Sequence, residues 1–312
     1  MRIANRSFLI ATLIMLFLNP LSYNSLSLSC KTNLNKSVED EFQKSISISV
    51  PLKLEINISQ GNINITRGND KEITISSKYE VLGIKEEEIK LTADKIKKDP
   101  PIEIKNNKIK IGNLKKYNID GWFSEEKVIM DLDIYAPAET TVIAETGLGN
   151  INITSLGSNV KAITGSGSIK IENAKSANAK TGSGYVKIIG IANDVNVIAG
   201  KGTIELAMLN GNINAKTGYG DITMNSTINE GKKWILDSGI GDVELKLSPG
   251  STFSFSCLTG LGKIDFKIKG EITEKTEKKV EGKVGTNPTS SLSIKVGKGD
   301  ILIEESIVSI SI

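Results

Sequence analysis

The chain contains Gly147-Leu148-Gly149-Asn150-Ile151-Asn152-Ile153, a phrase of two spaced glycines followed by alternating apolar residues. Eight copies of this phrase occur, and their first glycines lie 18, 17, 18, 18, 21, 21 and 37 residues apart. A period near 20 residues built from short alternating segments is typical of a solenoid, in which each repeat stacks on its neighbours. The sequence therefore predicts an all-β fold, a single-stranded β-helix or β-solenoid with about 18–21 residues per repeat.

Apolar residues also alternate before each first glycine. The third residue back is apolar in every copy, as in Ala162, Ala179 and Val197. Because successive side chains of a strand point to opposite faces, each repeat is predicted to hold two short strands with one buried face. The strands meet at a tight corner, where glycine reaches backbone angles closed to other residues. The predicted structural corner glycines are Gly147, Gly149, Gly165, Gly167, Gly182, Gly184, Gly200, Gly202, Gly218, Gly220, Gly239, Gly241, Gly260, Gly262, Gly297 and Gly299.

Composition divides the chain into four segments. Residues 1–29 are predicted to be a signal peptide, 30–44 an N-terminal linker, 45–140 a β-rich segment that starts or caps the coil, and 141–312 the solenoid repeats. Within the third segment, Gly61-Asn62-Ile63-Asn64-Ile65 reproduces the second half of the phrase, so the coil can begin there.

Two parts of the chain depart from the repeat pattern. The charged insertion 271–288 lies in the longest gap between copies and is interpreted as one omitted or degenerate rung plus a solvated loop. Between Glu86 and Lys98 the apolar spacing predicts a short helix that ends before two prolines. The aromatic cluster Tyr117, Trp122 and Phe123 is interpreted as a cap over the open end of the coil, in preference to a binding loop.

The N-terminus predicts export. Arg2 and Arg6 precede an apolar run from Phe8 to Leu18, interrupted by Thr12, which is too short to span a membrane as a helix. Cys30 is the candidate for lipidation, as in a bacterial lipoprotein, and ordinary cleavage near Ser27 or Ser29 is the alternative. We therefore expect a protein of the cell envelope, in the periplasm or on the outer surface, that touches a membrane only through such a lipid anchor.

Several chemistries find no support in the sequence. The chain has no histidine, which excludes histidine-dependent triads and zinc sites. The carboxylates Asp221, Asp242 and Asp300 share one repeat position with Lys263 and are not expected to form a dense row, so a glycosidase site is not predicted. A calcium site is not predicted either, because the spacing of Gly-x-Gly-Asp differs from that of the calcium-binding nonapeptide repeat. The 39 basic residues exceed the 36 acidic ones by three, and two of them lie in the predicted signal peptide, so nucleic acid is not an expected partner. No catalytic residue, cofactor or metal is predicted.

The stretches Asp131-Leu132-Asp133-Ile134-Tyr135-Ala136-Pro137 and Val142 to Ile151, followed by recurring Thr-Gly-x-Gly units, resemble the bacterial putative adhesin family. The resemblance covers roughly Ser45 to Ile303 and implies a β-helical envelope or surface protein with a binding role; the family has no defined catalytic or ligand residues to carry over. The expected function is a non-enzymatic, exported adhesin or binding module whose regular polar face meets a glycan or protein ligand on the envelope or a host surface. The alternative is a periplasmic structural or signalling component that binds other proteins of the same cell.

Overall fold

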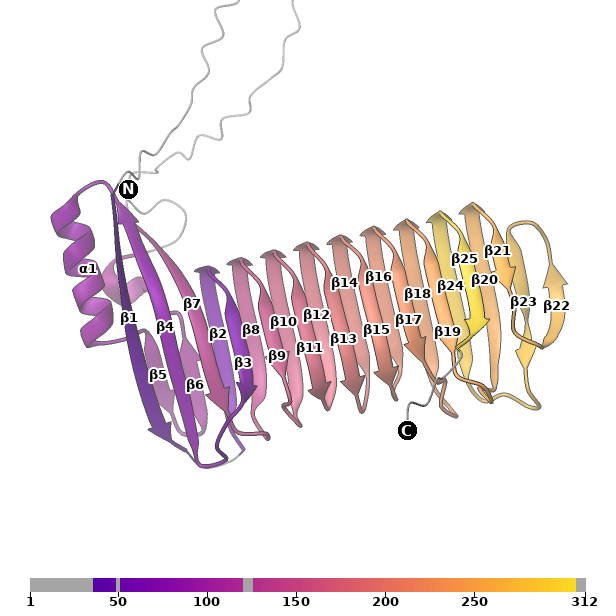
Figure 1. The fold of residues 1–312 in the computed structure, drawn as a ribbon, viewed down its shortest axis with the longest axis horizontal. Coiled ribbons are helices and arrows are strands. Elements are labelled where there is room, and N and C mark those ends of the chain that lie inside the picture. The colour runs from indigo at the N-terminus through magenta and orange to yellow at the C-terminus, as the bar shows by residue number, and fades with distance from the viewer. Residues whose placement is uncertain (1–35, 49–50, 120–125, 307–312) are drawn as a thin grey trace, which may run out of the picture. The chain divides into compact units, whose positions relative to one another are not determined.

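The repeats form rungs, each made of one strand, a glycine corner and a second strand. The computed structural model describes residues 36–48, 51–119 and 126–306 of the unit Leu34–Ile312. The first strands of the rungs lie in a thirteen-stranded sheet, here called sheet B, and the second strands in a twelve-stranded sheet, sheet A. Successive rungs lie side by side in both sheets (Figure 1). The prediction of an all-β solenoid is confirmed.

Nine rungs are present among the described residues. They are β2 (Lys53–Gln60) with β3 (Ile63–Arg67), β8 (Thr141–Leu148) with β9 (Ile151–Thr154), β10 (Asn159–Ser166) with β11 (Ile169–Ala174), β12 (Ser176–Ser183) with β13 (Val186–Ile191), β14 (Val195–Lys201) with β15 (Ile204–Leu209), β16 (Ile213–Tyr219) with β17 (Ile222–Ser226), β18 (Lys233–Ile240) with β19 (Val243–Leu247), β20 (Phe253–Leu261) with β21 (Ile264–Phe266), and β24 (Ser291–Lys298) with β25 (Ile301–Glu305). The first of these rungs precedes the eight full copies of the phrase, at the point where the half phrase begins.

Adjacent rungs pair in parallel, residue for residue. Val160 of β10 faces Ala177 of β12, and Ala162 faces Ala179, so equivalent apolar side chains stack in buried columns. At the corner, Gly167 has a φ of +150°, and a Cβ there would lie 2.0 Å from the carbonyl oxygen of Gly149. The hydroxyl of Thr164 donates to that same oxygen at 2.9 Å. The corner thus brings backbone against backbone so closely that only glycine fits.

The N-terminal end is a cap that lies beyond the first rung and is formed by residues before β2 and between β3 and β8. It comprises β1 (Lys36–Ser47), β4 (Glu72–Gly83), α1 (Glu86–Lys98), β5 (Ile102–Lys105), β6 (Lys108–Ile111), η1 (Lys115–Tyr117) and β7 (Lys127–Ala136). Strand β7 extends sheet A beside β3, with β4 and β1 antiparallel beyond it, while β6 and β5 extend sheet B beside β2. Helix α1, where the sequence predicted it, packs its buried residues on β1 and β4, and the Tyr79 hydroxyl donates to its Ala93 carbonyl at 2.9 Å. Trp122 and Phe123 lie outside the described residues.

The C-terminal end corrects one expectation. The charged insertion is not a loop with a missing rung, because β22 (Glu271–Lys275) and β23 (Lys279–Val284) form an antiparallel hairpin that pairs with β20. The last rung of the described chain, β24–β25, lies between β18–β19 and β20–β21, ahead of its place in chain order (Figure 1). Inward aromatic residues pack together at this end, where the rings of Phe255 and Phe266 stack with centroids 4.2 Å apart.

Candidate functional site

A row of asparagines runs across the outer face of sheet B. Asn178, Asn196 and Asn214 alternate with buried residues on β12, β14 and β16, so their side chains point outward at equivalent positions. Asn196 Nδ2 donates to Asn178 Oδ1 at 3.3 Å, and Asn214 Nδ2 donates to Asn196 Oδ1 at 2.8 Å. Because parallel strands lie about 4.8 Å apart, the amides repeat at that spacing. These three residues, with Asp194 and Asn212 described next, are called the amide face.

A second polar column runs beside the first. Both the backbone N–H and the Nδ2 of Asn212 donate to Asp194 Oδ1 at 3.0 Å, and the Lys233 backbone N–H donates to Asn212 Oδ1 at 3.0 Å. These bonds fix the side chains against the sheet. The amide face is therefore an ordered surface, because its rotamers are held by bonds along the rungs.

The outer face of sheet B is hollowed. A cavity of about 590 Å³ lies over the amide face and is bordered by Lys233 and Ile235. Two further hollows lie over the same sheet: one of about 710 Å³ where β2 and β8 meet the cap, and one of about 370 Å³ where β20 and β24 meet the hairpin. The face that carries the amides is thus also the face that can surround a ligand.

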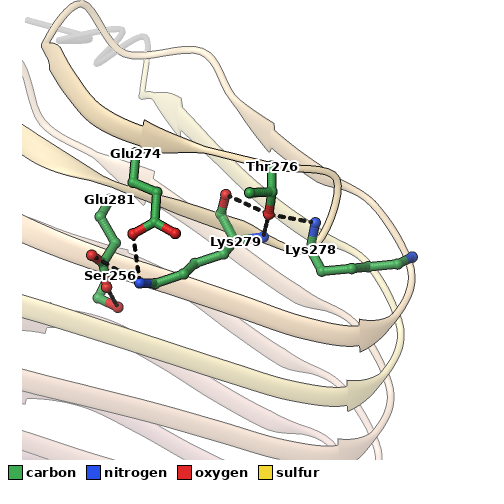
Figure 2. A network of polar contacts seen from close by, with 6 residues as sticks. All are labelled: Ser256, Glu274, Thr276, Lys278, Lys279 and Glu281. Carbon is green, nitrogen blue, oxygen red and sulfur yellow. Dashed lines mark hydrogen bonds and ion pairs between the residues drawn. The ribbon is translucent and has the colours of Figure 1, made fainter.

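Charged groups near the two ends of this face are paired with each other. At the cap, Lys108 and Lys53 donate to Glu55 at 2.7 and 2.9 Å and lower the pKa of its carboxyl from 4.5 to about 2. At the hairpin, Lys279 contacts Glu274 at 2.7 Å and Glu281 at 3.1 Å (Figure 2). The charges at both ends therefore serve their own ion pairs. The asparagine row between them offers neutral hydrogen-bonding groups, and the one carboxylate of the amide face, Asp194, accepts from Asn212.

One atom marks the end of the asparagine row. Asn214 Oδ1 is buried and has no hydrogen-bond partner within the described part of the chain. The next position in the column is Ile235 on β18, which has no donor to offer. The asparagine row therefore ends at β16, because the sequence has isoleucine at the next position of the column.

The glycine corners that lead into sheet A carry a row that the sequence did not lead us to expect. Because β25 lies directly beside β19, Asp221, Asp242 and Asp300 fall on three consecutive rungs. Asp221 Oδ1 accepts the Asp242 N–H at 2.8 Å, and Asp242 Oδ1 accepts the Asp300 N–H at 2.7 Å. The expectation of no carboxylate row is wrong for these three residues, whose oxygens brace the corners. Across residues 36–48, 51–119 and 126–306, no group of three or more acidic or cysteine side chains is arranged to hold a metal ion.

Of the two cysteines, only Cys257 lies among the described residues. Cys30, the lipidation candidate, lies outside the described residues. Cys257 is fully buried on β20, and burial raises the pKa of its thiol to about 12, so it stays protonated at neutral pH. In the described ranges, no helix is long and apolar enough to cross a membrane.

The amide face was not singled out in the sequence, although a signal for it exists. Asn178, Asn196 and Asn214 each stand four residues before the first glycine of their copy. Alignment of the copies on the outward positions, as well as on the buried ones, would have shown the column.

Comparison with known proteins places these features in a family. Residues 51–304 match the family model described as Toastrack DUF4097. The chain belongs to the Toastrack DUF4097 family. The match confirms the resemblance noted in the sequence and covers the nine rungs and the cap except for β1.

Two solved structures are similar to the chain. One is described as a putative adhesin from Bacteroides fragilis, with 17% identity over 86% of this chain and 97% of that chain and a TM-score of 0.43. The other is described as a putative cell adhesion protein from Clostridium sporogenes, with 16% identity over 86% of this chain and 100% of that chain and a TM-score of 0.30. No curated protein matches the chain.

Proposed function

We propose that this protein is a non-catalytic binding module of the cell envelope that holds an extended glycan along the outer face of sheet B. The amide face under its cavity is the observation that carries the proposal. A side-chain amide has two N–H donors and two acceptor lone pairs. Asn196 uses one donor and one acceptor in the row, so one of each stays available to a ligand.

A polyhydroxylated ligand suits this chemistry. Each sugar hydroxyl both donates and accepts, as each amide does, and a linear glycan can follow groups that repeat at about 4.8 Å. The lack of histidine in the chain supports a binding role over a catalytic one. So does the use of the Asp221, Asp242 and Asp300 oxygens as corner braces, in which Asp300 Oδ1 accepts the Lys263 N–H at 2.7 Å.

A glycan and matrix-protein array tests this function with the mature protein and two variants. Asn196→Ala removes the centre of the amide face, and we expect at least about tenfold weaker binding to the glycans that the wild type retains, the effect of about 1.4 kcal/mol. Asn152→Ala is the matched control, because Asn152 Nδ2 donates to Asn64 Oδ1 at 2.9 Å in a similar row on sheet A. Equal loss in both variants, or binding to proteins alone, would contradict the proposal.

We also propose that the module is displayed outside the cell, tethered through Cys30. Metabolic labelling with a fatty acid should mark the wild type and leave Cys30→Ala unlabelled. Added protease should cleave the protein on intact cells. Complete protection would instead favour the periplasmic structural or signalling component.

A further inference from the structure

The inserted rung β24–β25 occupies a slot between two rungs that precede it in the chain. On one side β24 pairs with β18 and β25 with β19, and on the other side they pair with β20 and β21. Both flanking rungs are joined to one another directly by residues 248–252, which bypass the slot. The place between the two flanking rungs, here called the slot, is thus filled by a rung that comes later in the chain than both of its walls.

The two walls of the slot are equivalent. Leu292 faces Trp234 on one side and Phe255 on the other, so both walls have the same register against the insert. The corner bonds repeat as well: the Gly241 N–H donates to the Lys298 carbonyl at 2.9 Å, and the Gly299 N–H donates to the Leu261 carbonyl at 2.8 Å. The slot thus selects a strand pair that carries the glycine phrase in this one register.

The insert is connected to the preceding strands by one short segment. Residues 285–290 join β23 to β24, and they include Gly285 with a φ of +79°, Asn287 with a φ of +48°, and Pro288. Six extended residues span up to about 20 Å. Rungs of the regular coil from β10 to β17, in contrast, are connected through the chain to both of the rungs they pair with.

We propose that β24–β25 is an exchangeable rung, and that the slot accepts it from a second copy of the chain as well as from its own. The bonds on both walls are the same whichever copy supplies the strand pair, so exchange requires only the rearrangement of residues 285–290 and the association of two copies. Two copies would then join by reciprocal insertion, each completing the core of the other. The exchange rests on the pairing of β24 and β25 and not on glycan binding, although β18, one wall of the slot, also borders the cavity over the amide face through Lys233 and Ile235.

Co-refolding of two differently tagged copies tests the exchange, in a Cys30→Ser, Cys257→Ala background. One copy carries Ile235→Cys and the other Ser293→Cys, positions that face each other across β18 and β24 on the outer side of sheet B. Adjacent strands place such residues within disulfide range. Since neither copy has a second cysteine, exchange should give a disulfide-linked heterodimer at twice the monomer mass, in a yield that rises with protein concentration.

A control pair of copies measures how much disulfide-linked heterodimer forms without exchange of a rung. Asn214→Cys and Ile235→Cys face each other across β16 and β18, which belong to regular rungs. Each pair of substitutions placed in one chain should form an intrachain disulfide, which verifies folding and register. The proposal would be overturned if, at every protein concentration, the heterodimer yield of the 235 and 293 pair did not exceed that of the 214 and 235 pair.

Discussion

The regular rungs from β8 to β19 and the C-terminal block from β20 to β25 use the same phrase but stack differently. In the first region, each rung lies beside the next one in the sequence. In the second, the chain leaves β19, skips one place, forms β20–β21 and the hairpin, and returns to fill the vacancy with β24–β25. The comparison teaches that the phrase sets the geometry of a rung and leaves the order of rungs open.

The hairpin explains why β20–β21 is the terminal rung. Strand β23 covers the outer edge of β20, and the Ser256 hydroxyl attaches it by donating to Glu281 at 2.8 Å (Figure 2). Beyond it, β22 is fully exposed and carries Glu271, Glu274 and Lys275. A charged, exposed edge discourages further strand pairing. The hairpin follows β21 directly in the chain and covers the outer edge of β20. The remaining rung, β24–β25, can therefore pair on both sides only if it lies between β18–β19 and β20–β21.

The largest expected effect is on a corner glycine of the regular region. At Gly184 the φ is +148°, and an added Cβ would lie 2.0 Å from the Gly167 carbonyl oxygen, so Gly184→Ala should lower the free energy of unfolding by about 3 kcal/mol or more. Gly299→Ala, with a φ of +148° in the inserted rung, should disrupt the C-terminal block and leave the regular rungs folded. Denaturant titration and hydrogen exchange measure both effects.

The control for these glycines is Gly231→Ala. Its φ is +70°, but an added Cβ meets no atom within 4 Å, so only backbone strain of about 1 kcal/mol is expected. A loss at Gly184 no larger than this would show that the corner is less tightly packed than the geometry indicates.

The next largest effect is expected when a buried isoleucine is truncated, and it should differ between the regular rungs and the C-terminal block. Ile188 on β13 and Ile294 on β24 are both fully buried, and their replacement by alanine should each cost about 2–5 kcal/mol locally. Hydrogen exchange should increase across the whole coil in Ile188→Ala, because interruption in the middle uncouples both halves. In Ile294→Ala the increase should stay within residues 253–305; an increase that reached β8 would contradict independent behaviour of the block.

Thiol labelling measures opening of the block directly. With Cys30 replaced by serine, Cys257 should react with a thiol reagent only when the block opens, because the thiol is buried and its pKa is raised to about 12. The matched probe is Ala179→Cys with Cys257→Ala, at the equivalent position of a regular rung. We expect Cys257 to be labelled about tenfold faster, which corresponds to an opening about 1.4 kcal/mol easier. Equal rates would show one cooperative unit.

The smallest effect is expected at the cap end. The pKa of Glu55 is lowered to about 2 in the folded protein, below its ordinary value of 4.5, because Lys108 and Lys53 donate to it. A depressed folded pKa stabilises the protein above pH 4.5, and that contribution is lost as the pH falls toward 2. The pair is solvent-screened, so the loss should be below about 1 kcal/mol. Denaturation midpoints at pH 7 and pH 3 should differ less in Glu55→Gln than in the wild type.

The sequence by itself determined the rung. Alternation of apolar residues defined two one-sided strands, and the glycine pair marked the corner between them, because both depend on the backbone and neighbours of a few residues. The half phrase at Gly61 marked the first rung for the same reason. The outward column of Asn178, Asn196 and Asn214 is equally local and could be read from the same register.

Only the tertiary structure decided the order of the rungs. Every rung presents nearly the same edge in the same register, so the local sequence does not distinguish β20 from β24 as the neighbour of β18. The choice depends on the hairpin that covers β20, which is a contact between strands far apart in the fold. That contact also placed Asp300 beside Asp242. The geometry of a rung is thus set by residues close together in the chain, whereas the order of the rungs is set by which strand edge the hairpin covers.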